Sequence, residues 1–116
     1  MPEIIANPTL IPVPGGKTIE EYVGSASSSD EAVSIAHMVA PAGWDEPFQA
    51  PEFDEFTVVL DGELLVDHGD ETTSVSAGQA VITRAGERIR YRTEKGARYV
   101  AVCLPAFSID RVNRED

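Results

Sequence analysis

The sequence predicts an all-β protein whose strands form a sandwich or barrel. Three observations support this prediction. Short segments rich in β-branched and aromatic residues alternate with turn-forming residues about every eight to twelve positions from residue 32 to 105. Almost no segment shows the longer apolar period of an amphipathic helix. The chain of 116 residues has the length of a single domain with one core.

The predicted strands follow one another from residue 32 onward. They span 32–40, 55–60, 63–67, 72–77, 79–83, 88–93 and 97–104. The dipeptide Asp61-Gly62 is typical of a two-residue hairpin turn, so we expect 63–67 to return antiparallel beside 55–60. Pro105 ends the series of strands.

The sequence predicts an N-terminal extended arm with a short helical turn over 1–31, the barrel over 32–105 and a C-terminal tail over 106–116. Such an arm often pairs at a sheet edge or crosses to a partner subunit. Prolines keep the first part of the arm extended. Thr18 and Glu21 have the spacing of a capping box and predict one short helical turn. Segment 55–60 is apolar on both faces, so its outer face needs cover from the arm or a second subunit. We therefore expect a homodimer.

The charge of the chain excludes several kinds of partner. Twenty acidic residues against nine basic ones give a net charge of −11. Binding to nucleic acid requires a basic surface, and an anionic membrane would repel this chain as well. A small polar or anionic metabolite is the partner that we expect. The lone cysteine, Cys103, and an N-terminus without a signal-peptide pattern favour a cytoplasmic location.

The segment 43–62, which reads GWDEPFQAPEFDEFTVVLDG, has an informative spacing. Gly43 is followed after five residues by Gln49-Ala50-Pro51, then by Glu55 and Gly62. A second set of spaced residues follows later in the chain and also begins with a glycine. It contains Gly78, Arg84-Ala85-Gly86, Ile89 and Thr93. Both spacings resemble the two motifs of the cupin superfamily, which implies a double-stranded β-helix, or jelly-roll, barrel. The pieces VLDG, GERIRY and ARYVAV are similar to those of ethanolamine-utilisation EutQ-like cupins.

The resemblance implies a metal site whose histidine ligands are replaced in this chain. The three histidine positions of the motifs hold Gln49, Pro51 and Ile89, while the glutamate position is kept as Glu55. An amide oxygen is a weak ligand for a transition metal, and proline and isoleucine side chains offer none. We therefore expect no cofactor. A divalent metal held by His37, Gln49 and Glu55 is the alternative, and it requires His37 to face inward.

Glu55 is the first candidate for a functional residue. Burial in an apolar barrel would raise the pKa of its carboxyl group, which suits a general acid or base or the binding of a ligand amine. The alternative is a structural glutamate with a polar partner. Tyr91 is the candidate partner, because it shares a strand face with Ile89 and should point inward with it.

The remaining candidates surround the first motif. Gln49, Trp44 and Phe53 would line a small-molecule site at the barrel mouth, although the aromatic residues could instead pack the loop down. His37 would join them only if its strand face is inward. The alternating arginines at 88, 90 and 92 either pair with acids on a neighbouring strand or subunit, or form an anion site.

The sequence therefore predicts a small-molecule-binding cupin barrel without the three-histidine metal site. Two alternatives stay open. One is an enzyme that uses Glu55 for proton transfer or isomerisation of a small metabolite. The other is a metal-dependent cupin with a changed ligand set.

Overall fold

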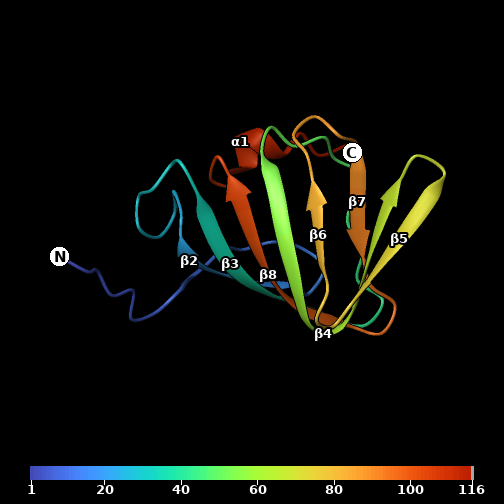
Figure 1. Ribbon diagram of the computed structural model, residues 1–116, viewed down its shortest axis with the longest axis horizontal. Coiled ribbons are helices and arrows are strands. Elements are labelled where there is room, and N and C mark those ends of the chain that lie inside the picture. Colours follow the sequence, from blue (N-terminus) through green and yellow to red (C-terminus); the bar gives the residue numbers. More distant parts are fainter. Residues whose placement is uncertain (116) are drawn as a thin grey trace.

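Eight strands and one short helix form the part of the chain, residues 1–115, that the computed structural model describes (Figure 1). In chain order they are β1 (Thr9–Leu10), β2 (Thr18–Val23), β3 (Ser34–Ala40), β4 (Asp54–His68), β5 (Glu71–Ser76), β6 (Ala80–Thr83), β7 (Ile89–Arg92), β8 (Ala97–Leu104) and α1 (Ile109–Val112). This composition confirms the all-β prediction. No helix within this range is long and apolar enough to cross a membrane.

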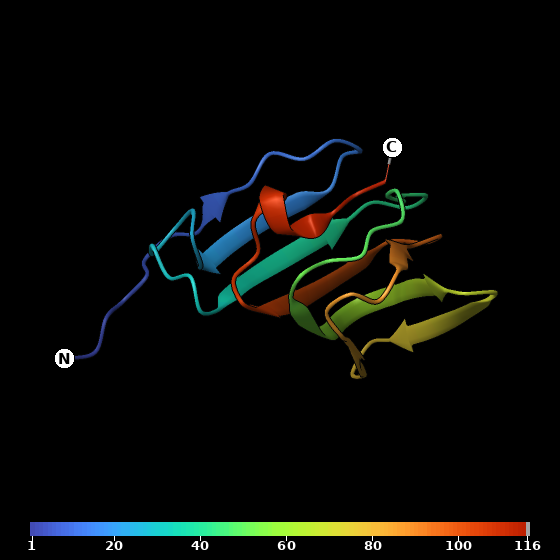
Figure 2. The same cartoon turned by 90° about the horizontal axis from the view of Figure 1, so that it is seen from above.

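The strands form two sheets that share β4 and pack face to face (Figure 2). The larger sheet has the order β1-β2-β3-β8-β4-β6, and the smaller one places β4 between β5 and β7. The first half of β4 pairs in the larger sheet and its second half in the smaller one. A single long strand therefore connects both layers of the jelly roll.

The predicted hairpin turn at Asp61-Gly62 is wrong. β4 continues through both residues without reversing direction. Its register with β8 shifts between Val59 and Asp61, and Gly62 has a φ of 77°. A glycine with positive φ at such a shift bends the strand and increases its twist, as a β-bulge does. The predicted strands 55–60 and 63–67 are the two halves of this bent strand.

The predicted helical turn at residues 18–21 is also wrong, because these residues begin β2. The strand pairs with β1 on one side and β3 on the other, so the arm extends the larger sheet. Its alternation buries Ile19 and Glu21. The Glu21 carboxylate accepts hydrogen bonds from the backbone N–H groups of Ala26 and Ser27 and from the Ser27 hydroxyl. Glu21 therefore holds the loop after β2 and does not cap a helix.

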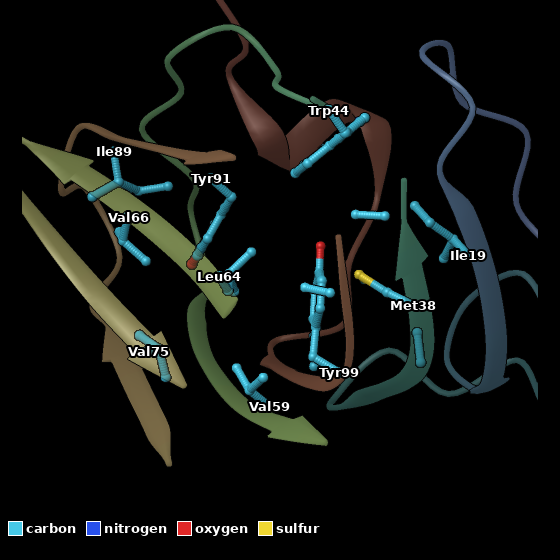
Figure 3. Packing of buried hydrophobic residues seen from close by; sticks show 14 residues of the cluster. Ile19, Met38, Trp44, Val59, Leu64, Val66, Val75, Ile89, Tyr91 and Tyr99 are labelled. Carbon is cyan, nitrogen blue, oxygen red and sulfur yellow. The ribbon is translucent and has the colours of Figure 1, made fainter. Parts of the chain in front are cut away.

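The main core lies between the two sheets (Figure 3). Leu64 and Val66 of β4 face it from the smaller sheet, and Met38 and Tyr99 face it from the larger one. A second, smaller cluster joins α1 to β8 and to the segment before β4. It contains Phe53, Cys103 and Val112, with Phe107 packed against it.

The outer face of the larger sheet carries two rows of cross-strand neighbours that are mostly apolar, called here the outer apolar face. One row is Ile35, Val102, Phe56 and Ile82, and the next row is His37, Val100, Val58 and Ala80. Val58 is 46% exposed and Ile82 is 51% exposed. The sequence prediction that the outer face of 55–60 lacks its own cover therefore holds, and the arm does not supply it.

Candidate functional site

The two sequence motifs lie side by side in the folded chain. The backbone N–H of Gln49 donates to the carbonyl of Ile89 at 2.9 Å, and the N–H of Ile89 donates back at 2.8 Å. Pro51 is buried beyond this bridge. Glu55 points inward from β4 with 8% of its surface exposed. The positions that hold the family's metal ligands are thus brought together as the spacing implies.

The side chains at these positions do not fit a metal ion. Ile89 is buried and fills its place with hydrocarbon. The Gln49 amide oxygen accepts a hydrogen bond from Arg114 Nε at 3.3 Å, so a cationic side chain already uses it. Among residues 1–115, no group of three His, Cys, Asp or Glu side chains gathers where it could hold a metal. Glu55 is the one carboxylate that remains from the family's ligand set, and Lys17, Glu46 and Tyr91 are the groups near it.

His37 is not part of this interior. The alternation of β3 buries Ser34, Ala36 and Met38, which leaves His37 on the opposite face. There its Nδ1 lies 2.9 Å from the Glu20 Oε1 of β2. The structure therefore brings Gln49 and Glu55 together but does not bring His37 to them.

Three ionisable side chains outside the motifs accompany Glu55 around one small interior cavity. They are Lys17 at the start of β2, Glu46 from the loop before β4, and Arg114 from the C-terminal tail. Glu46 has a side chain only 9% exposed, and its Oε1 lies 3.9 Å from Arg114 Nη2. The Lys17 Nζ lies over two aromatic rings, 4.3 Å from the centroid of Trp44 and 5.3 Å from that of Tyr99.

These three residues were not among the sequence predictions, for identifiable physical reasons. Lys17 immediately precedes β2, two positions before the buried Ile19, so interpreting 18–23 as a strand would have indicated an inward Lys17. Glu46 and Arg114 lie in irregular segments without a period to follow. Their segments are positioned by bridges to the smaller sheet and to each other, from Asp45 to Arg92 and from Gln49 to Arg114.

The buried setting moves the pKa values of this group toward neutrality. Burial raises the pKa of Glu55 to about 7, against the opposing effect of the Lys17 cation, and the Glu46 carboxylate raises it further. Burial likewise raises the pKa of Glu46, which Lys17 and Arg114 oppose. Burial lowers the pKa of Lys17, while the two glutamates oppose that change. Near neutral pH, the Glu55 carboxyl can therefore both hold and release a proton.

Two spaces that share lining residues lie beside these side chains. The interior cavity, about 30 Å³, has room for a water molecule and includes Glu55, Gln49, Phe53 and Tyr91 in its lining. A larger pocket, about 190 Å³, lies between the arm and the loop at 44–47. It is called here the mouth pocket, and its lining residues are Val13, Pro14, Gly15, Lys17, Ile19, Trp44, Asp45, Glu46, Pro47 and Arg114. Lys17, Glu46 and Arg114 line both spaces.

Several buried polar atoms near this group have no hydrogen-bond partner within residues 1–115. They are Glu46 Oε2, Thr57 Oγ1 and the Tyr99 hydroxyl. Figure 3 shows the Tyr99 hydroxyl pointing toward Trp44 at one end of the core. Buried polar atoms in folded proteins are almost always bonded to protein or to ordered water. Glu46 Oε2, at the wall of the interior cavity, can therefore accept a hydrogen bond from a molecule that enters it.

The other candidates line the same two spaces. Tyr91 points inward as predicted, and its hydroxyl lies 2.7 Å from that of Thr83. Trp44 lines the mouth pocket. Phe53 lines the interior cavity and packs edge-on against Phe107 with ring centroids 6.0 Å apart.

The arginines of β7 pair with an acid on the neighbouring strand, which was one of the two sequence interpretations. Arg90 Nε and Arg92 Nε donate to Asp67 of β4 at 2.9 and 2.8 Å. The hydrogen bond from Arg92 is the main reason that the pKa of Asp67 lies well below its usual range. These arginines therefore link β7 to β4 within the smaller sheet.

The chain belongs to the Cupin domain family, which it matches over residues 36–104. Among curated proteins, it is 44% identical over 108 residues to "Endoribonuclease YbeY" of Myxococcus xanthus, covering 91% of this chain and 37% of that protein. It is 35% identical over 65 residues to "Acetate kinase EutQ" of Salmonella typhimurium, covering 54% of this chain and 28% of that protein. The chain thus spans well under half the length of these two relatives.

Solved structures agree with this assignment. An ethanolamine utilisation protein, EutQ, from Salmonella typhimurium superimposes with a TM-score of 0.63 and 28% identity, covering 78% of this chain and 71% of that one. The polyketide cyclase RemF from Streptomyces resistomycificus gives a TM-score of 0.72 at 18% identity, covering 90% and 79%. The second likeness shows the fold alone. Together these likenesses confirm the jelly-roll barrel and the EutQ-like resemblance.

Proposed function

We propose that this protein binds a small polar or anionic metabolite, which enters through the mouth pocket and meets Lys17, Glu46 and Glu55. One observation carries the proposal. These three ionisable side chains converge on one cavity, and Glu46 Oε2 lies buried there without a hydrogen-bond partner among residues 1–115. A ligand with a hydrogen-bond donor would supply the missing bond.

The energetics support a role beyond stability for this group. Burying a charge costs free energy unless good partners surround it, and an apolar filling of the same volume is often at least as stable. The contact between Arg114 and Glu46 is loose at 3.9 Å, and Lys17 has aromatic rings as its nearest partners. A barrel shaped for stability alone would fill this space with hydrocarbon, as it does at Ile89.

The mouth pocket limits the size and shape of the ligand. Its volume of about 190 Å³ is below the range of roughly 300 Å³ and more that holds drug-sized molecules. Val13, Ile19 and Trp44 give it an apolar wall, while Lys17, Glu46 and Arg114 form a charged end. These features suit a metabolite with a short hydrocarbon part and one or two polar or anionic groups.

The names of the relatives indicate which compounds to try. RNA cleavage fits this chain poorly, since a net charge of −11 repels a phosphate backbone. Acetate, which the EutQ relative's name contains, is small enough for the mouth pocket. It belongs in the panel of candidate ligands beside other short carboxylic acids, amines and amino alcohols.

The test is a thermal-shift screen of this panel followed by calorimetric titration of the hits. We expect at least one compound to stabilise the protein and Glu55→Gln to weaken its binding about tenfold or more, a loss of about 1.4 kcal/mol. Glu71→Gln, which changes an exposed carboxylate on β5, is the matched control and should bind normally. Hits whose affinity is unchanged in both Glu46→Gln and Glu55→Gln would contradict the proposal.

A second candidate function is proton transfer on the same ligand. The observation that favours it is the pKa of Glu55, which burial raises to about 7, so the carboxyl can both donate and accept a proton near neutral pH. Incubating each hit with the protein in heavy water and following loss of proton signals by NMR would test it. Exchange in the natural protein but not in Glu55→Gln is the expected result, and equal exchange in both would refute it.

We also propose that the protein is a homodimer in which the outer apolar face of one chain covers that of another. Apolar side chains on four neighbouring strands support this, because a face of this kind is stabilised when it leaves water. The interior site lies on the other side of the sheet and would remain open in such a dimer.

A further inference from the structure

Lys17 is an unusual lysine for a small acidic protein. No carboxylate oxygen within residues 1–115 lies within 4.0 Å of its Nζ. The amine instead lies against the ring faces of Trp44 and Tyr99 and lines both the mouth pocket and the interior cavity. The chain has one other lysine, Lys95, which is exposed in the turn before β8.

The groups around Lys17 come from four parts of the chain. Glu46 of the loop and Glu55 of β4 favour the charged amine, and Arg114 of the tail disfavours it. Burial raises the pKa of the Cys103 thiol of β8 well above its usual range, so this group stays a neutral thiol. Burial outweighs these influences and lowers the pKa of Lys17, which increases the share of free amine near neutral pH.

We propose that Lys17 forms a Schiff base with small carbonyl compounds that enter the mouth pocket. The inference rests on the proposed function, because it requires the mouth pocket to admit a small molecule. It adds a chemical class, short aldehydes and ketones, and a covalent mode of binding. A lysine desolvated in an apolar pocket is a known arrangement for activating this side chain as a nucleophile.

The chemistry balances with groups that are present. The Lys17 lone pair forms a bond to the carbonyl carbon, the electrons of the C=O double bond move to oxygen, and one proton moves from nitrogen to that oxygen. The resulting carbinolamine loses its hydroxyl group as water when a protonated carboxyl donates a proton to it. The iminium nitrogen then returns its remaining proton to the carboxylate, which leaves the imine. Glu55, whose pKa is about 7, lines the adjoining cavity and is the candidate donor. The sum is aldehyde plus amine giving imine plus water, without an oxidant or reductant.

The experiment traps the imine with sodium cyanoborohydride, which reduces it to a stable secondary amine. The full-length protein is incubated with propanal near neutral pH, and peptide mapping by mass spectrometry follows the propyl group at Lys17, Lys95 and the N-terminal amine. We expect Lys17 to be labelled severalfold faster than Lys95, because the lowered pKa of Lys17 leaves a larger share of its amine free. Labelling of Lys17 no faster than Lys95 would overturn the inference.

Two variants make the result specific. Lys17→Arg keeps a cation over the Trp44 and Tyr99 rings and should abolish fast labelling, whereas Lys95→Arg should leave it unchanged. If fast labelling persists in Lys17→Arg, the inference is wrong. If a metabolite binds through Glu55 while Lys17 stays unreactive, the proposed function stands and this inference falls. If Lys17 reacts with propanal while no compound of the panel binds, the Schiff-base inference is supported. The proposed binding of a small polar or anionic metabolite is then wrong.

Discussion

At the residue scale, the Glu55 carboxyl links the stability of the barrel to pH. Its pKa is about 7 in the folded state against 4.5 for an ordinary glutamate. Between these values the folded chain keeps a proton that the unfolded chain has lost. The free energy of unfolding therefore falls as pH rises through this window, by about 3 kcal/mol in total, and is level above it.

This gives a prediction for Glu55→Gln, which removes the titration and keeps the shape. The stability of the variant relative to the natural protein should rise by about 3 kcal/mol from the acid side of the window to the alkaline side. Urea unfolding at several pH values measures this difference. Glu71→Gln should give a curve parallel to that of the natural protein, and a parallel curve for Glu55→Gln would contradict a buried, titrating Glu55.

At the element scale, Gly62 allows β4 to pass from one sheet to the other. A Cβ atom at this position would lie 2.1 Å from the backbone carbonyl oxygen of Gly96, and the φ of 77° is strained for any side chain. We expect Gly62→Ala to lower the free energy of unfolding by about 3 kcal/mol or more, measured by urea or thermal unfolding.

Gly69 is the matched control for this change. It also has a positive φ, of 57°, but a Cβ atom there would meet nothing within 4 Å. Gly69→Ala should therefore lose only the backbone preference, about 1 kcal/mol. If both variants lose similar amounts of unfolding free energy, the close contact between the Gly96 carbonyl oxygen and a Cβ at position 62 is not the cause.

The same element shows how far sequence could predict the fold. Alternation and turn residues located most strands, and the motif spacing located Gln49, Glu55 and Ile89 relative to one another. Asp61-Gly62 misled because the glycine that permits a hairpin turn equally permits a bulge, and only the partner strands decide between them. Thr18 and Glu21 misled in the same way, because strand pairing with β3 outweighed a local capping signal.

The candidate site was predictable only in part, and the reason is physical. Glu55, Tyr91 and Trp44 lie on or beside periodic strands and motifs, so their inward direction follows from the pattern. Arg114 enters from the tail, which is fixed by its bridge to Gln49 and by the hydrogen bond from the Glu115 N–H to the Phe48 carbonyl. Contacts between segments so distant in the sequence leave no periodic signal.

At the scale of the whole molecule, the barrel separates two kinds of surface. Ionisable side chains of both signs surround the small interior cavity. The outer apolar face instead exposes hydrophobic side chains to solvent. A chain with a net charge of −11 is kept apart from most partners by repulsion. A second copy can still associate if the apolar area gained outweighs that repulsion, which a stable interface of about 1,200–2,000 Å² would do.

The homodimer predicts a specific response to one charge on the outer apolar face. Val58 lies between Val100 and Ala80 on neighbouring strands and is 46% exposed. Val58→Glu would bury an unpaired carboxylate in the interface, so the variant should sediment as the 12.5 kDa monomer while the natural protein sediments as a dimer. Ile109→Glu makes the same change at an exposed site on α1 and should remain dimeric. The natural protein should be sedimented at about 0.1 mM, because a dimer with a Kd below micromolar is almost fully formed at that concentration. Sedimentation as a monomer there would refute the dimer.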